Sequence, residues 1–187
     1  MIDMDEYLFV TKYTLKKYLS KSIFNKCDFI KFNWVIATDN NLVYYDNRSL
    51  FERFKRPYIN SIYVKSIIRG NISNLHYYVH SPDKSPKNNI TCNSIGKRIY
   101  YKIMNFEAMA PMIRNAYIIH FKYKSTEEYI NKYKRGYSTW LGDKLKEALY
   151  IKIIEYLRDN EKTLEKINFF EKELKLNLTM FKINLKI

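Results

Sequence analysis

Three acidic residues, Asp3, Asp5 and Glu6, stand at the start of the chain, directly before an apolar run in "MIDMDEYLFV". We expect residues 2–10 to form a strand, on which the side chains of Asp3 and Asp5 point to the same face. Carboxylate oxygens are hard ligands, so two of them can share one Mg²⁺ or Mn²⁺ ion, especially when a diphosphate supplies further oxygens. The alternative is that these acids are simply solvated.

A second group of candidate residues lies in "IIHFKYKSTEEYINKYKRG". His120 ends an apolar segment, Lys124 and Ser125 come directly before a predicted helix, and Arg135 lies near the end of that helix. A helix N-terminus attracts anions because its first amides have no partner within the helix. Each residue also has a structural alternative: a strand-end histidine, a plain N-cap serine, and basic residues on a solvated helix face.

The elements that would position these residues are predicted from apolar periodicity and capping signals. Strands are expected over residues 2–10, 27–37, 61–70, 74–80, 98–104 and 115–123. A helix is expected after Thr14, a short segment at 50–57, a helix from a Ser125–Glu128 capping box to Gly136, and helices over 139–158 and 161–173. The alternation of Phe32, Trp34 and Ile36 predicts a half-buried strand, and the tail after residue 173 an edge strand or disorder.

Composition limits the class of partner. The chain has 187 residues, 47% of them apolar, and 33 Lys and Arg against 19 Asp and Glu, a net charge of +14. This length suits one domain with a core of its own. The surplus charge implies nucleic acid, a phosphate-bearing ligand or an anionic membrane surface, unless it reflects only a coding bias toward Lys.

The two cysteines and the apolar runs bear on the compartment. Cys27 and Cys92 are isolated and form no C-x-x-C motif, which predicts reduced thiols in a cytoplasmic protein. No apolar run approaches the roughly 18 residues of a membrane span, and the early acids do not fit a cleavable signal. We therefore expect a cytoplasmic protein that could contact the inner face of a membrane without crossing it.

Five segments follow one another in a recognisable order: "IDMDEYLFV", "IKFNWVIA", "LFERF", "VKSIIRG" and "IIHFKYKSTEEYINKYKRG". They resemble the glycosyltransferases grouped with family 92 and the related family-2-like enzymes of polysaccharide synthesis. There, a strand ending in D-x-D-E-F precedes an Asn-Trp strand, an E-R-F segment, a K-S strand and a block with H-Y, K-S, E-E and R-G. The resemblance covers about residues 2–137, and Phe121 stands where the family usually has Tyr.

The resemblance implies an α/β protein of the GT-A type, with a mixed sheet and C-terminal helices. Such an enzyme moves a sugar from a nucleotide-sugar to a glycan or lipid-linked acceptor. Asp3, Asp5 and His120 would hold Mn²⁺ or Mg²⁺ against the donor diphosphate.

Further residues take roles by the same resemblance. Lys124, Ser125 and Arg135 would contact the donor diphosphate. Trp34 would stack on a sugar, although a tryptophan in the core is the structural alternative. Glu52 would be the base that activates the acceptor hydroxyl.

The position of the D-x-D motif also carries an expectation. In enzymes of this kind a nucleotide-binding half of roughly 80–100 residues precedes it, in keeping with the doubly wound pattern. We therefore expect residues 1–137 to be the C-terminal, acceptor-side part of such a domain, followed by helices and a tail at 138–187. The chain would then be a truncated product, inactive alone, or one that pairs with a separately encoded first half.

Two other functions compete with this interpretation. A basic nucleic-acid-binding protein without catalysis would stack its Tyr and Phe rings on bases while lysines follow the phosphates. We do not expect it, because the basic residues are scattered along the chain. A phosphoryl-transfer or nuclease domain could use the same acids with Mg²⁺, but it would need further carboxylates at the metal.

Overall fold

The computed structural model describes residues 3–55, 58–70, 72, 89–99, 112–135, 143–174 and 178. The strand expected at 74–80, most of the one at 98–104, Gly136 and most of the tail lie outside the described residues. The chain divides into two compact units. The sheet unit comprises Met1–Ile36 and Asn60–His120, and the helical unit comprises Ala37–Ile59 and Phe121–Ile187.

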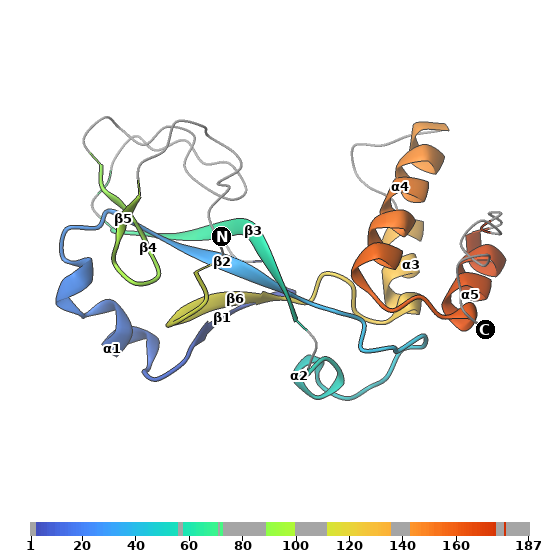
Figure 1. Cartoon of the computed structure of the whole chain (residues 1–187), viewed down its shortest axis with the longest axis horizontal. Coiled ribbons are helices and arrows are strands. Elements are labelled where there is room, and N and C mark those ends of the chain that lie inside the picture. The colour runs from blue at the N-terminus through green and yellow to red at the C-terminus, as the bar shows by residue number, and fades with distance from the viewer. Residues whose placement is uncertain are drawn as a thin grey trace. The chain divides into compact units, whose positions relative to one another are not determined.

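The described strands and helices follow the predicted order, except that the strand at Thr91–Asn93 and the 3-10 turn at Ser22–Phe24 were not predicted (Figure 1). The strands are β1 (Glu6–Val10), β2 (Phe29–Ala37), β3 (Tyr58–Ile68), β4 (Thr91–Asn93), β5 (Arg98–Ile99) and β6 (Ala116–His120). The helices are α1 (Leu15–Leu19), the 3-10 turn η1 (Ser22–Phe24), α2 (Leu50–Arg53), α3 (Thr126–Lys134), α4 (Asp143–Asp159) and α5 (Leu164–Leu174). The protein is therefore of the α/β class.

The described strands form one mixed sheet with the order β1-β6-β2-β4-β5, and β3 pairs with β2. β1 runs antiparallel to β6, whereas β2 runs parallel to both β6 and β4. Register places Glu6 opposite His120 and Leu8 opposite Ile118, and Trp34 is the partner of Ile118 on the other side. Residues paired across strands share a face, so the start of β1, the end of β6 and the middle of β2 meet on one face.

This same face carries the core of the sheet unit. Thr14 caps α1 through its side chain, as predicted, and the helix buries Tyr18 against the sheet. The Tyr18 hydroxyl donates a hydrogen bond to the carbonyl oxygen of Ser94, and its ring packs on Phe24 and Phe32. The core of buried side chains consists of Tyr18, Phe24, Cys27, Ile30, Phe32, Trp34, Cys92, Ala116 and Ile118.

β2 is buried on both faces, so the expectation of a half-buried strand is wrong. All nine of its residues are buried, including the polar Lys31 and Asn33 between the apolar positions. The Asn33 amide donates to the carbonyl oxygen of Ser61 and accepts from the Met112 amide. The alternation in the sequence shows only where polar residue types occur. Hydrogen-bond partners from distant segments allow those polar residues to be buried.

The two cysteines are joined in a disulfide, so the prediction of two reduced thiols is wrong. Cys27 lies just before β2 and Cys92 lies in β4, 65 residues further along the chain. Parallel pairing of these two strands sets Ile30 opposite Cys92 and brings the thiols together. Spacing along the sequence gave no sign of this pairing, because it depends on the order of strands in the sheet.

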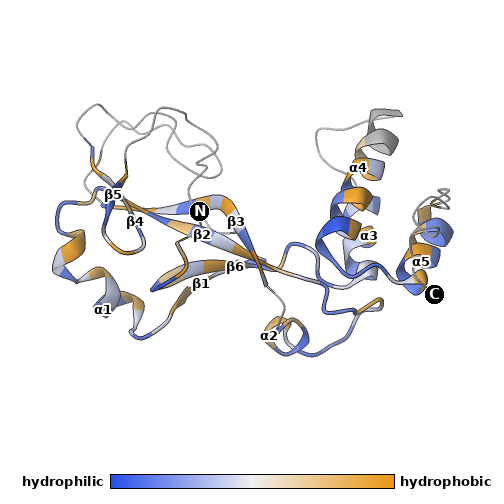
Figure 2. Ribbon diagram, in the orientation of Figure 1, coloured by the Kyte–Doolittle hydropathy of each residue, from blue (hydrophilic) through white to orange (hydrophobic). Residues whose placement is uncertain are grey.

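The helical unit begins where β2 ends and contains α2 to α5. The capping box predicted at Ser125 and Glu128 is confirmed, and Ser49 and Glu52 form a second one at α2. Figure 2 shows apolar residues interspersed with hydrophilic ones along α4 and α5, as expected for helices that pack by one side. Within the described ranges, every helix is too short or too polar to cross a lipid bilayer.

Candidate functional site

Asp3 and Asp5 lie in the turn that precedes β1, not on the strand itself, and Glu6 is the first residue of the strand. The Glu6 amide donates to the carbonyl oxygen of Asp3 at 3.0 Å, and the Asp3 amide donates to the Glu6 carboxylate at 3.2 Å. The prediction that Asp3 and Asp5 share a strand face is therefore wrong. The reason is that Glu6 folds back onto the Asp3 amide, so the turn gives each aspartate a different neighbour.

Asp3 and Glu6 both contact Lys65 of β3. The Lys65 Nζ lies 3.1 Å from Asp3 Oδ2 and 3.4 Å from Glu6 Oε2. The side chains of Lys65 and Glu6 are buried, whereas about half of the Asp3 side chain is exposed. A cation from a distant strand thus offsets the charge that the acids bring to the edge of the core, which is what allows them to be there.

Asp5 lies close to the end of β6. Its Oδ1 lies 3.7 Å from the Nε2 of His120, and both side chains are mostly buried. The His120 ring in turn packs edge-on against Trp34, with ring centroids 4.4 Å apart. His120, Trp34 and Asp5, three of the residues predicted to serve the site, are therefore brought together.

Glu6 is the most deeply placed acid of the group. Burial raises the pKa of Glu6 above its ordinary value, although the hydrogen bond from the Asp3 amide and the charge of Lys65 act in the opposite direction. Its Oε1 is buried, and no described residue donates a hydrogen bond to it. An acceptor without a donor is costly inside a protein, so this oxygen leaves the hydrogen bonding of the cluster incomplete.

Three members of the site, Glu6, Tyr63 and Lys65, have no role assigned from the sequence. Lys65 was noticed only as part of the "VKSIIRG" segment, and Tyr63, two residues before it on β3, was not noticed at all. The Tyr63 ring lies 5.4 Å from Trp34, and the Lys65 Nζ lies 5.9 Å from the same ring. Their spacing of two was the available signal, because such residues share a strand face. We call Asp3, Asp5, Glu6, Trp34, Tyr63, Lys65 and His120 the acid–aromatic cluster.

The second group of predicted residues lies in the helical unit, at the start of α3. The first amides of this helix already have partners: Thr126 donates to the carbonyl oxygen of Leu42 and Glu127 to that of Val43. The Glu128 amide donates to the buried Ser125 hydroxyl. The anion cradle predicted at this N-terminus is thus occupied by the protein's own acceptors.

The remaining predicted residues of the helical unit are placed as follows. Lys124 has a φ of 57°, in the left-handed region, and it immediately precedes the helix cap. Arg135 is the exposed C-cap residue of α3. Their contact with a diphosphate stays a prediction.

A buried ion pair joins two further segments on which the resemblance depends. Arg53 of α2 donates to both carboxylate oxygens of Glu128, at 2.6 and 3.3 Å. Burial by itself would raise the pKa of Glu128, but the hydrogen bonds from Arg53 and Ser125 outweigh it and lower that pKa. The "ERF" and "KSTEE" segments therefore meet to hold the helical unit together.

Glu52, the predicted base, is an exposed member of the cap of α2. The Ser49 hydroxyl donates to its carboxylate at 2.7 Å and lowers the pKa of Glu52 below its ordinary value. A carboxylate with a lowered pKa is a weaker proton acceptor. The geometry therefore gives Glu52 a capping role, and its role as a base stays a prediction.

The acid–aromatic cluster offers oxygen ligands of the kind that Mg²⁺ and Mn²⁺ prefer. In the described part of the chain, no three His, Cys, Asp or Glu side chains are grouped closely enough to hold a metal ion. Asp3 and Asp5 alone would give one or two carboxylates, which is the usual protein share where phosphate oxygens of a ligand complete the shell. A metal ion held by Asp3, Asp5 and His120 stays a prediction.

Comparisons with known proteins add no relative. No family model matches the chain, and no curated protein or solved structure matches it either.

Proposed function

We propose that the protein is a glycosyltransferase of the GT-A type, or the acceptor-side part of one, which binds a nucleotide-sugar at the acid–aromatic cluster. One observation carries the proposal. Four segments that the resemblance orders along the sequence converge at this cluster, one residue or more from each: the D-x-D-E turn, Trp34 of β2, Lys65 of β3 and His120 of β6. A chance likeness in sequence order would not require such convergence.

Within this proposal the chain's own residues have distinct tasks. Asp3 and Asp5 hold the metal ion, and His120 orients Asp5 from the end of β6. When bound, Mn²⁺ or Mg²⁺ neutralises charge on the departing nucleoside diphosphate. Lys65 is a positioning residue, because its ammonium group holds the Asp3 turn against the sheet. The acceptor is a glycan or a lipid-linked saccharide.

Isothermal titration with UDP and GDP, with and without MnCl₂, tests the proposal. We expect binding that depends on Mn²⁺ and that Asp5→Asn abolishes. Asp46→Asn is the matched control, because Asp46 is a half-buried aspartate whose partner is Arg48 instead of a cluster residue. Binding that needs no metal, or that survives Asp5→Asn, would overturn the assignment.

The nucleic-acid alternative also has an observation in its favour. The ammonium groups of Lys17 and Lys21 lie 5.7 and 3.7 Å from the ring centre of the exposed Tyr13, and residues 7–26 contain no acid. Rings and cations arranged in this way suit single-stranded nucleic acid. The same protein is therefore titrated with an oligo(U) RNA at two salt concentrations. Tight, salt-sensitive RNA binding without nucleotide-sugar binding would favour the alternative.

A further inference from the structure

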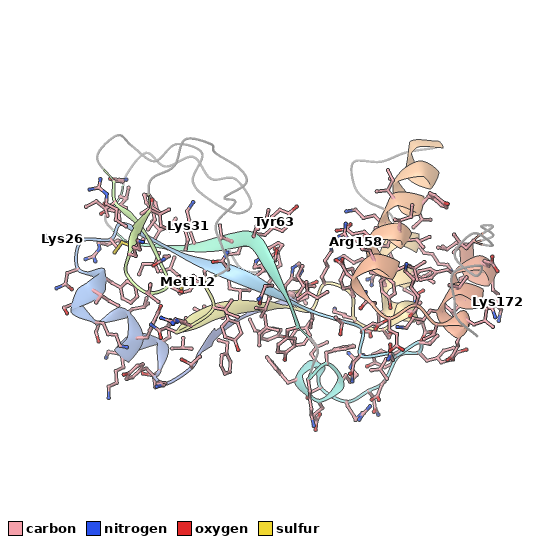
Figure 3. All side chains as sticks on the ribbon, viewed as in Figure 1. Lys26, Lys31, Tyr63, Met112, Arg158 and Lys172 are labelled. Carbon is pink, nitrogen blue, oxygen red and sulfur yellow. A yellow bond between two sulfur atoms is a disulfide. The ribbon has the colours of Figure 1, made fainter. Side chains whose placement is uncertain are left out.

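Trp34, the residue expected to stack on a sugar, is not well placed to do so, whereas its neighbour Tyr63 is. Only 8% of Trp34 is exposed, and it belongs to the core of the sheet unit. Tyr63 is 39% exposed, and its ring rests on Trp34 at 5.4 Å between centroids. Figure 3 labels Tyr63 on β3, beside the central strands. Trp34 therefore supports an exposed ring from behind.

Three rings form a continuous row along this face of the sheet. Tyr63 contacts Trp34, and Trp34 contacts His120 at 4.4 Å. Supported from behind by Trp34, the Tyr63 ring loses little conformational freedom when a ligand lies against it. An exposed ring held in this way is a prepared binding surface.

Carboxylates near Trp34 and His120 indicate what kind of ligand the row of rings suits. Asp5 lies at His120, and Asp3 and Glu6 lie at Lys65, which itself faces Trp34. The face of an aromatic ring is electron-rich and attracts weakly positive C–H groups, whereas carboxylates accept hydrogen bonds from hydroxyl groups. A pyranose ring presents both, with C–H groups on its faces and hydroxyl groups on its rim. An excess of acids over cations favours a neutral sugar over a uronic acid.

We propose that Tyr63 is a stacking platform for a neutral pyranose ring, with Trp34 as the residue that positions it. The inference rests on the proposed function, because it assigns the sugar of the nucleotide-sugar, or that of the acceptor, to this ring. The inference also assigns to Tyr63 the stacking role that the resemblance implied for Trp34. In this arrangement Tyr63 contacts the sugar, and Trp34 supports the Tyr63 ring without touching the sugar.

Two titrations separate this inference from the function on which it rests. The first compares UDP with UDP-glucose and UDP-galactose in the presence of Mn²⁺. Tyr63→Ala is expected to weaken the binding of the UDP-sugars about three- to tenfold while leaving UDP unchanged, the range of an aromatic contact. Tyr63→Phe keeps the ring and is expected to bind like the wild type.

Tyr7→Ala is the matched control, because Tyr7 is exposed to the same degree, 38%, but projects from the face of β1 opposite to Glu6. It should change neither affinity. Equal weakening of UDP and UDP-sugars by Tyr63→Ala, or no weakening at all, would overturn the platform.

The second measurement does not involve a nucleotide. Saturation-transfer NMR with methyl β-D-glucopyranoside and methyl β-D-galactopyranoside, at millimolar concentration, reports contact of the sugar with the protein directly. A signal in the wild type and in Tyr63→Phe that disappears in Tyr63→Ala supports the platform even if no nucleoside diphosphate binds. The absence of any signal in the wild type overturns the platform, whereas a failure of UDP and GDP to bind overturns the proposed function alone.

Discussion

Two buried lysines in two regions of the molecule face acids in different ways. In the helical unit, Lys166 and Asp39 are almost completely buried and lie 2.6 Å apart. Lys166 also donates to Asn41 and to the carbonyl oxygen of Glu161, while the Tyr156 hydroxyl donates to Asp39. In the sheet unit, Lys65 is buried but its partner Asp3 is half exposed, at 3.1 Å.

The difference lies in how completely the charges are satisfied. Every hydrogen of the Lys166 ammonium group has an acceptor, and the Asp39 amide is held by Asn160 as well. Burial raises the pKa of Tyr156 well above its ordinary value, and the charge of Asp39 adds to the effect. Glu6 in the sheet unit instead keeps an oxygen to which no described residue donates. A network with its hydrogen bonds complete stabilises a fold, whereas a buried acceptor without a donor costs free energy.

The largest effect should come from breaking the satisfied network. Lys166→Met leaves the Asp39 charge buried without its cation, which we expect to lower the free energy of unfolding by about 3–5 kcal/mol. Urea denaturation followed by circular dichroism measures it. Lys162→Met, at an exposed residue two positions before α5, is the control and should change the free energy of unfolding little. Similar losses in both variants would show that the network does not stabilise the fold.

The disulfide constrains the sheet unit by joining two residues that are 65 positions apart in the sequence. Replacing Cys27 and Cys92 by Ala should lower the free energy of unfolding by about 2–4 kcal/mol, because the bond closes a long loop in the unfolded chain. Dithiothreitol should have the same effect on the wild type and none on the variant. Labelling of both cysteines by iodoacetamide in non-reducing guanidinium would contradict the disulfide.

Lys31 offers a test of the sheet unit through pH. Burial lowers the pKa of Lys31 to about 8, below the 10.5 of an ordinary lysine. Between these values the unfolded chain binds a proton that the folded chain lacks, so this group makes stability rise with pH. At pH 7 we expect Lys31→Met to be more stable than the wild type by about 1–3 kcal/mol. Urea denaturation from pH 7 to 10 should show that advantage shrinking; a constant difference would contradict the lowered pKa.

Lys65→Met should have the smallest effect on stability, and it completes the comparison with Lys166→Met. Water can solvate the half-exposed Asp3, and Glu6 already has a raised pKa and can take up a proton, so we expect a loss of about 1–2 kcal/mol. The same change removes the group that positions the Asp3 turn, so Mn²⁺ should bind more weakly in a titration. A loss of stability as large as that of Lys166→Met would show that both lysines are structural.

Local features of the fold were predictable because their interactions span few residues. The Thr14 cap and the Ser125–Glu128 capping box depend on contacts three residues apart, and the structure contains both. The strand that became β6 was predicted from a continuous apolar run, and α5 from its helical pattern, each to within a few residues. The resemblance also implied one site that includes Asp5, Trp34 and His120 together with Glu52, Lys124, Ser125 and Arg135, and the structure brings the first three together.

Tertiary structure alone decided which distant residues became partners. No local signal joins Cys27 to Cys92, Lys65 to Asp3, or Tyr63 to Trp34, because each pair depends on strand order and register in the sheet. The same holds for the start of α3, whose first amides are used by the carbonyl oxygens of Leu42 and Val43. The sequence by itself determined the chemical types present and their local elements. Long-range packing determined which acids are offset by a lysine and which aromatic ring is left exposed to a ligand.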